Sequence, residues 1–294
     1  MKIIVTGSLG HIGRPLTKEL VQKGHSVKVI SSNPERQKDI EALGATAAIG
    51  SVEDAGFLAS AFIGADTVYA MIPPKITVPD PMAYSQKIAD SYAQAIQQAG
   101  VKRVVYVSSY GAQLEKGAGL IVLHHHAENT LNKLPNLVAI THLRATYVYY
   151  NFYRFVDMIK GMGYIAANYG GDDNLVMVSP EDIAAAVAEE IETQTTGKKI
   201  KYVASDERTC NEIAHIFGEA IGKPDLKWIT LTNEEMQSGY EANGIPAPVA
   251  AAFVEMFGAI HSGLLHEDYE LNKPKTMGKV KIEDFAKEFA ASFK

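Results

Sequence analysis

A short apolar run that leads straight into three evenly spaced glycines constrains the fold of this chain most. Ile3-Ile4-Val5 is β-branched, and Gly7, Gly10 and Gly13 follow it in the order G-x-x-G-x-x-G. Residues 11–23 come next and carry apolar side chains at helical spacing, ending at Gly24. A strand that turns through glycines into a helix is the first half of a parallel strand–helix–strand unit.

The same alternation continues to about residue 150. Strands are predicted over residues 27–30, 46–49, 67–70, 103–107 and 137–143, and helices over 34–43, 82–99 and 120–134, with a further helix around Phe57 to Phe62 that Ser51 is expected to cap. Nearly continuous apolar strands joined by helices indicate parallel strands with both faces covered. The pattern predicts an α/β fold, a doubly wound parallel-sheet Rossmann fold.

The pattern loosens after residue 150. Residues 179–193 are predicted to form a helix opened by Ser179, and 200–203 an edge strand of the main sheet. Capping boxes at Thr209 and Thr232 start two more helices, and residues 282–293 form an amphipathic one. We expect residues 1–150 with 179–205 to form an NAD(P)-binding domain. Residues 151–178 with 206–294 would form a smaller C-terminal α/β substrate lobe.

Composition narrows the class of protein. The chain has 294 residues and a single cysteine, Cys210, so neither an internal disulfide nor a Cys-rich zinc site can form. A net charge of −6 argues against a nucleic-acid partner, and the absence of an 18-residue apolar run argues against a membrane span. The start MKIIVTG has no signal-peptide features, so we expect a cytoplasmic protein, either a monomer or a homodimer.

The glycine-rich turn predicts a dinucleotide site. Glycines let the backbone approach a pyrophosphate closely, and the following helix N-terminus offers amides and a partial positive charge. The predicted contacts are Gly7, Ser8, Leu9, Gly10, His11, Ile12 and Gly13. The alternative is a tight turn that binds nothing.

The end of the second strand favours NADP(H) over NAD(H), which stays possible. NAD-binding folds often place an acid there to hold the ribose hydroxyls. Here the tip carries Ser31, Ser32, Asn33 and, slightly later, Arg36, which suit a 2′-phosphate. The alternative is a plain loop with a solvated arginine.

Five segments together resemble the NmrA-like atypical short-chain dehydrogenases/reductases. They are the glycine loop, Ala70 to Pro74, Val104 to Ser109, His142 to Arg144 and Val178 to Ala184. That family includes quinone oxidoreductases, triphenylmethane-dye reductases, isoflavone-type reductases and a non-catalytic redox-sensing regulator. The resemblance is dense over residues 1–185 and thin afterwards.

The resemblance implies where chemistry would occur. The Tyr-x-x-x-Lys pair of better-known relatives is absent; His124 stands where related reductases carry a lysine, with Glu128 one turn later. His124 is a candidate to contact the nicotinamide ribose or to donate a proton, or else it is an ordinary surface histidine oriented by Glu128. Further predicted cofactor contacts are Met71, Ile72, Pro73, Ser108 and Ser109. The alternatives are a plain sheet cap for the first three and a polar strand end for Ser108.

Aromatic residues supply the remaining candidates. Tyr110 is a weaker candidate proton donor, or a wall of the pocket. Tyr147, Tyr149 and Tyr150 begin the second lobe and suit a flat aromatic substrate, or else form an interlobe core. His124, His125 and His126 point in different directions on a helix, so no metal site is expected.

Two functions therefore fit the sequence. The first is an NADPH-dependent reductase of a small aromatic or quinone-like acceptor, since such acceptors take a hydride without a strong general acid. The second is a non-catalytic NADP(H)-binding redox sensor that acts through a protein partner.

Overall fold

The computed structural model describes residues 1–75 and 78–294, which divide into two compact units. Unit 1 consists of residues 1–109, 123–144 and 183–201, and unit 2 of residues 110–122, 145–182 and 202–294. The predicted domains differ from these units mainly at residues 110–122, which belong to unit 2. Each unit is described by itself.

A seven-stranded sheet forms the centre of unit 1, with strand order β10-β6-β5-β4-β1-β2-β3. The strands are β1 (Lys2–Val5), β2 (Ser26–Ser31), β3 (Thr46–Ile49), β4 (Thr67–Ala70), β5 (Arg103–Ser109), β6 (Ala139–Ala145) and β10 (Lys198–Val203). β1 pairs in parallel with β2 and β4, and β5 continues in parallel from β4. This confirms the doubly wound α/β fold and the edge position of residues 200–203.

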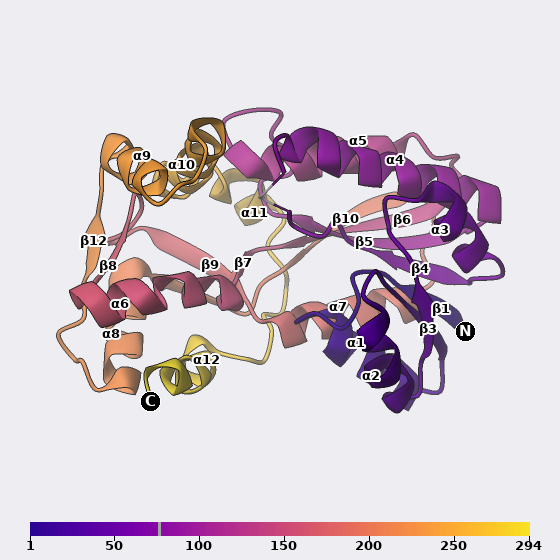
Figure 1. Cartoon of the computed structure of the whole chain (residues 1–294), viewed down its shortest axis with the longest axis horizontal. Coiled ribbons are helices and arrows are strands. Elements are labelled where there is room, and N and C mark those ends of the chain that lie inside the picture. The colour runs from indigo at the N-terminus through magenta and orange to yellow at the C-terminus, as the bar shows by residue number, and fades with distance from the viewer. Residues whose placement is uncertain (76–77) are drawn as a thin grey trace. The chain divides into compact units, whose positions relative to one another are not determined.

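Helices cover both faces of this sheet (Figure 1). They are α1 (Gly13–Gln22), η1 (Pro34–Arg36), α2 (Gln37–Ala42), α3 (Ala55–Phe62), α4 (Pro81–Ala99), α5 (Val122–Asn132) and α7 (Pro180–Glu192). The prediction that Ser51 caps α3 is wrong. Asp54 is the N-cap and accepts from Phe57 N, whereas Ser51 Oγ accepts from Glu53 N in the preceding turn.

The apolar strand residues of unit 1 pack against these helices. Ile4, Val68 and Val104 from three neighbouring strands share one buried cluster with Tyr92 of α4 and Leu131 of α5. This cluster is the core on one face of the sheet, while Ile3, Val5 and Val105 are buried outside it. Burial on both faces is what the continuous apolar runs predicted.

Unit 2 contains two smaller sheets and a separate aromatic core. One sheet has the order β11-β9-β7 and the other pairs β12 with β8. The strands are β7 (Tyr147–Val148), β8 (Ile165–Ala167), β9 (Asn174–Val178), β11 (Asp206–Thr209) and β12 (Trp228–Thr230). The helices are η2 (Gly119–Ile121), η3 (Tyr149–Phe155), α6 (Val156–Met162), α8 (Cys210–Ile221), α9 (Asn233–Ala242), α10 (Ala247–His261), α11 (His266–Leu271), α12 (Ile282–Phe289) and η4 (Ala290–Phe293). Both predicted capping boxes form, at Thr209 and Thr232.

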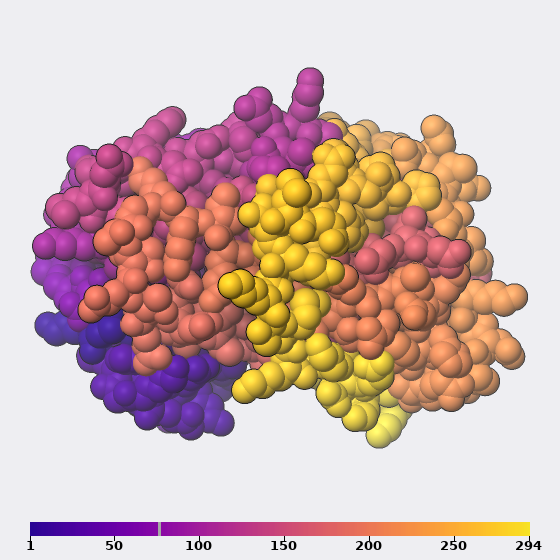
Figure 2. Space-filling view, turned by 180° about the vertical axis from the view of Figure 1, so that it is seen from behind, coloured from indigo at the N-terminus to yellow at the C-terminus, as the bar shows by residue number. Residues whose placement is uncertain are grey.

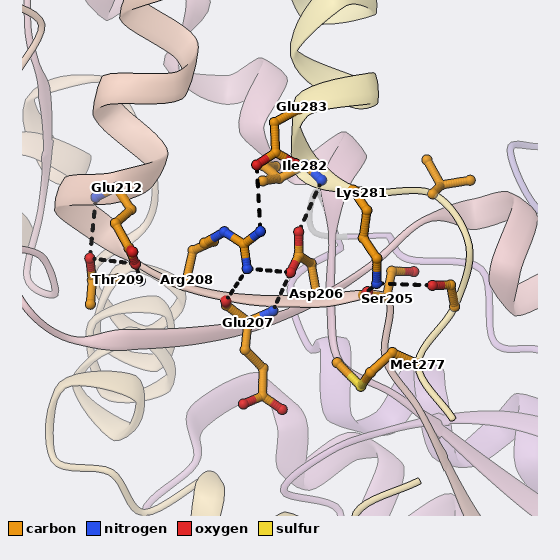
Figure 3. A network of polar contacts seen from close by, with 12 residues as sticks. Ser205, Asp206, Glu207, Arg208, Thr209, Glu212, Met277, Lys281, Ile282 and Glu283 are labelled. Atoms are coloured by element: carbon orange, nitrogen blue, oxygen red, sulfur yellow. Dashed lines mark hydrogen bonds and ion pairs between the residues drawn. The ribbon is translucent and has the colours of Figure 1, made fainter. Parts of the chain in front are cut away.

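The chain between α11 and α12 forms a strap that polar contacts hold in place. It lies at the surface in the back view (Figure 2). Asp182 accepts from the backbone N–H of Lys279 and Val280, each at 3.0 Å. Asp206 accepts from Ile282 N and from Arg208, which also pairs with Glu283 (Figure 3). These bonds fix the start of α12, whose apolar face is buried.

No helix among residues 1–75 and 78–294 is long and apolar enough to cross a membrane.

Candidate functional site

The glycine-rich loop has the conformation that its sequence predicts. Gly7 has φ +84°, and Ser8 is the non-glycine residue of the described chain with positive φ, at 60°. A Cβ on Gly13 would lie 2.1 Å from the carbonyl oxygen of Ser8, and one on Gly7 would lie 2.7 Å from Met71 Sδ. Gly13 is therefore required by close packing against backbone and Gly7 by its positive φ, whereas Gly10 meets only Gly7 O at 3.7 Å.

Hydrogen bonds attach this loop to the neighbouring strands. Ser8 N donates to Ile30 O at 3.0 Å, and Ser8 Oγ donates to Ser31 Oγ at 2.9 Å. On the other side, Tyr92 OH donates to the carbonyl of Met71 at 2.8 Å and lies 3.0 Å from Thr6 Oγ1, whose hydroxyl can donate to it. Leu9 is buried, His11 is exposed, and Ile12, Ile72 and Pro73 are half-buried. The structure thus brings the predicted loop residues to the ends of β1, β2 and β4.

No side chain caps the first turn of α1 at Ile12. The first amides of a helix carry no intrahelical partner and present a partial positive charge. With the two close-packed glycines beside them, these amides form a cradle that fits a phosphate group.

An acid that was not among the predicted residues follows β2, in α2. Ser31 is buried, Ser32 is exposed, and Asn33 caps η1 by accepting from Glu35 N. Arg36 Nη1 lies 3.2 Å from Asp39 Oδ2, and Arg14 Nη2 lies 3.6 Å from the same oxygen. The strand tip thus holds two arginines around one carboxylate, because α1 and the turn after β2 meet there. Arg14 in α1 and Asp39 in α2 do not adjoin the strand in the sequence, so the residues at its tip gave no signal for them.

A buried ion pair supports the end of β5. Glu128 of α5 accepts from Arg144 Nε at Oε1 (3.0 Å) and from Nη2 at Oε2 (2.8 Å), and Ser108 Oγ also donates to Oε1, at 2.6 Å. Burial alone would raise the pKa of Glu128, but the hydrogen bonds and charges of Arg144, with those of its other polar neighbours, hold it below its ordinary value. The pair therefore holds Ser108 and the end of β5 in place, and Ser108 is buried. Ser109, the last residue of β5, is half-buried.

His124 is oriented by Tyr106. The alternative of an ordinary surface histidine had assigned that role to Glu128. The Nδ1 of His124 lies 2.9 Å from the hydroxyl of Tyr106, whose side chain is fully buried. Burial lowers the pKa of His124 to about 4, with Glu128 opposing the shift. The imidazole is therefore neutral near pH 7, which argues against the expected role as a charged proton donor. It can still donate or accept one hydrogen bond.

The remaining predicted residues belong to unit 2. Tyr110 is buried with its ring edge-on to His266, and burial raises its pKa above the ordinary value. Tyr149 is completely buried and donates to Val280 O at 3.1 Å, so it is part of a packed core. Tyr147 is buried, while Tyr150 is 43% exposed. The two candidate catalytic residues, His124 and Tyr110, thus lie in different units, and their roles stay predictions.

Metal ligation has no structural support in the part of the chain that is described: no group of three or more His, Cys, Asp or Glu side chains gathers there.

The model of the NmrA-like family matches residues 1–285. The chain belongs to the NmrA-like family. It is 23% identical over 299 residues to an NAD(P)H azoreductase of Xenophilus azovorans, with 99% of each chain covered.

Two solved structures share the fold. An NADPH-dependent quinone oxidoreductase of Escherichia coli, complexed with NADPH, gives a TM-score of 0.80 at 20% identity, covering 97% of this chain and 99% of that one. The triphenylmethane reductase of Citrobacter sp., complexed with NADP(H), gives 0.79 at 21% identity, covering 98% and 99%. The resemblance to NmrA-like proteins seen in the sequence is confirmed.

Proposed function

We propose that the protein is an NADPH-dependent reductase that transfers a hydride to a small aromatic or quinone-like acceptor. The observation that carries the proposal is the phosphate cradle of unit 1. Gly7 and Gly13 admit no side chain there, and α1 begins without a side-chain cap. The azoreductase relative, named for NAD(P)H, matches over almost the whole chain and supports the same class of activity.

The cradle fits a dinucleotide by its own geometry. The first amides of α1 would hold the pyrophosphate, and Ser31 and Asn33 at the end of β2 would face the adenosine ribose. The bound nicotinamide would supply the hydride. On the protein's side, the Glu128–Arg144 pair holds the end of β5 in place, and neutral His124, fixed by Tyr106, offers one hydrogen bond to a ribose hydroxyl.

The proposed acceptor is quinone-like because the candidate residues of α5 include no strong general acid. The described chain contains no Tyr-x-x-x-Lys pair in α5, and His124 carries no proton to give as an imidazolium near pH 7. A quinone accepts a hydride without a strong acid, because its carbonyl oxygens stabilise the developing charge. Alcohol dehydrogenation, which needs such a pair, is a poorer fit.

NADPH is preferred over NADH in this proposal because two cations stand at the end of β2. Arg14 and Arg36 share the single carboxylate of Asp39, which leaves one net positive charge for a 2′-phosphate. Asp39 reduces that preference without reversing it.

The test is NADPH oxidation by the purified protein with quinones and triphenylmethane dyes, and with NADH in parallel. Turnover with NADPH, and slower turnover with NADH at equal concentration, is expected. A folded protein that binds NADPH but turns over no acceptor would contradict the proposal. It would favour a non-catalytic NADP(H) sensor that acts through a protein partner.

A further inference from the structure

Arg154, at the end of η3 in unit 2, stacks on aromatic rings. Its guanidinium carbon lies 4.0 Å from the ring centroid of Phe257 and 4.6 Å from that of Phe155. Its Nη2 donates to the hydroxyl of Tyr169 at 2.9 Å. The residue is nevertheless solvent-exposed, while Tyr169 and Phe257 are buried. A rigid cation that solvent can reach is thus held on buried aromatic rings.

Arg154 differs from every other arginine of the chain in its partners. The five others each lie within ion-pair distance of a carboxylate: Arg14, Arg36, Arg103, Arg144 and Arg208. Within residues 1–75 and 78–294, no carboxylate is paired with Arg154. Four of its five N–H donors have no protein acceptor there. The positive charge is therefore uncompensated by any acid of the described chain.

A second donor group lies next to this cation. Tyr169 OH donates to Tyr147 OH at 3.3 Å, so the hydroxyl proton of Tyr147 is directed elsewhere. Burial raises the pKa of Tyr147, although Arg154 opposes the shift, and the hydroxyl stays protonated at neutral pH. Arg154, Tyr169 and Tyr147 thus form a chain of donors that begins at a cation.

We propose that Arg154 binds the carboxylate or sulfonate of a planar aromatic ligand. The ligand's ring would lie against the half-buried rings of Phe253, with its centroid 6.1 Å from that of Phe257, and Tyr240, with its centroid 5.5 Å from that of Phe253. A planar guanidinium matches a carboxylate in a two-point contact, and unused donors over aromatic faces favour a flat anion over a neutral molecule. This inference rests on the proposed reductase function in one respect: the ligand is the acceptor, which would carry an acidic substituent.

Binding of 2-naphthoate and its neutral analogue 2-naphthamide to the full-length protein, measured by calorimetry, tests the site without turnover. We expect naphthoate to bind about tenfold more tightly or better, as one charge-assisted contact allows. Arg154→Gln should bring the two dissociation constants within about twofold of each other, and Arg154→Lys should keep only part of the preference because the planar fork is lost. Thermal melting would confirm that each variant is folded.

Lys160→Gln is the matched control, because Lys160 is an exposed cation over the ring of Phe293, 5.6 Å away. It should leave the preference for naphthoate unchanged. Equal binding of both compounds to the wild type, or a preference that survives Arg154→Gln, would overturn the assignment.

Turnover separates this inference from the proposed function. NADPH oxidation would be compared for 1,4-naphthoquinone and its 2-sulfonate, in the wild type and in Arg154→Gln. A lower KM for the sulfonate that disappears in the variant is expected. Turnover of both quinones with a KM ratio that the variant does not change would overturn the inference alone. If no quinone turned over while naphthoate still required Arg154 for binding, the reductase proposal would fail and the anion site would stand.

Discussion

Asp39 determines how available Arg36 is to a ligand. Its carboxylate lies 3.2 Å from Arg36 and 3.6 Å from Arg14, and all three side chains are about half exposed. Exposed ion pairs of this kind contribute little to stability, about 0–1 kcal/mol, so a phosphate can displace the carboxylate at small cost. The arginines are therefore held near the end of β2 without being locked there.

Removing Arg36 and removing the charge of Asp39 should shift the preference for NADPH over NADH in opposite directions. Arg36→Ala should weaken NADPH binding by about 1–3 kcal/mol, the loss of a charge-assisted contact, and leave NADH nearly unchanged. Asp39→Asn should tighten NADPH binding about twofold to fivefold, because the carboxylate no longer competes for the arginines. Titration of cofactor fluorescence measures both. Equal losses for NADPH and NADH in Arg36→Ala would remove Arg36 from the 2′-phosphate site.

His124 should make the protein less stable in mild acid. The pKa of His124 is about 4 when folded, against an ordinary value of 6.5 that it regains on unfolding. Between these values the unfolded chain binds the extra proton, so the free energy of unfolding rises with pH there and is constant for this group above 6.5. The wild type should lose stability as the pH falls from 6.5 to 4. We expect this loss to be about 1–3 kcal/mol smaller in His124→Asn.

Urea denaturation at a series of pH values measures this slope. The matched control is His126→Asn, since His126 is exposed on the same helix. A slope that His124→Asn leaves as steep as in the wild type would show that other groups cause the acid sensitivity.

Elements whose signals are local were predicted from the sequence, and contacts between elements were not. The runs at 46–49 and 67–70 match β3 and β4 residue for residue, because turn residues bound short apolar runs on both sides. α3 begins after its N-cap Asp54 and not near Ser51, because Ser51 Oγ accepts from Glu53 N in a turn that precedes the helix. The Glu128–Arg144 pair joins α5 to β6, and only packing reveals that Glu128 faces Arg144 instead of His124.

Gly278 shows how a loop residue can fix a helix start. A Cβ there would lie 2.2 Å from Asp182 Oδ2, the oxygen that accepts from Val280 N and Ser205 Oγ. Gly278→Ala must displace either the strap or this carboxylate, and should lower the free energy of unfolding by about 1–3 kcal/mol. Chemical denaturation measures the change.

Gly239→Ala provides the contrast, because Gly239 lies within α9 and a Cβ there meets nothing within 4 Å. That substitution should be neutral or stabilise the helix by up to about 1 kcal/mol. If Gly278→Ala behaved like Gly239→Ala, the strap would not depend on close packing against Asp182.

At the scale of the whole molecule, the chain passes between the two units repeatedly. Six segments alternate between unit 1 and unit 2, with boundaries after residues 109, 122, 144, 182 and 201. Each unit has its own buried cluster, but α5 and α7 each begin at a residue assigned to unit 2 and continue into unit 1. Unfolding one unit would therefore release the ends of helices that the other needs, which favours a single cooperative transition.

Trp228, the one tryptophan of the chain, reports on unit 2, whereas the proposed phosphate cradle belongs to unit 1. We expect the urea transition followed by Trp228 fluorescence to coincide with that followed by far-UV circular dichroism. NADP⁺ at a hundredfold excess over its dissociation constant should stabilise both by the same amount, about 2.7 kcal/mol. If the cofactor moved the circular dichroism transition and left that of Trp228 in place, the two units would unfold independently. The ligand's effect would then be confined to unit 1, despite the five crossings of the chain.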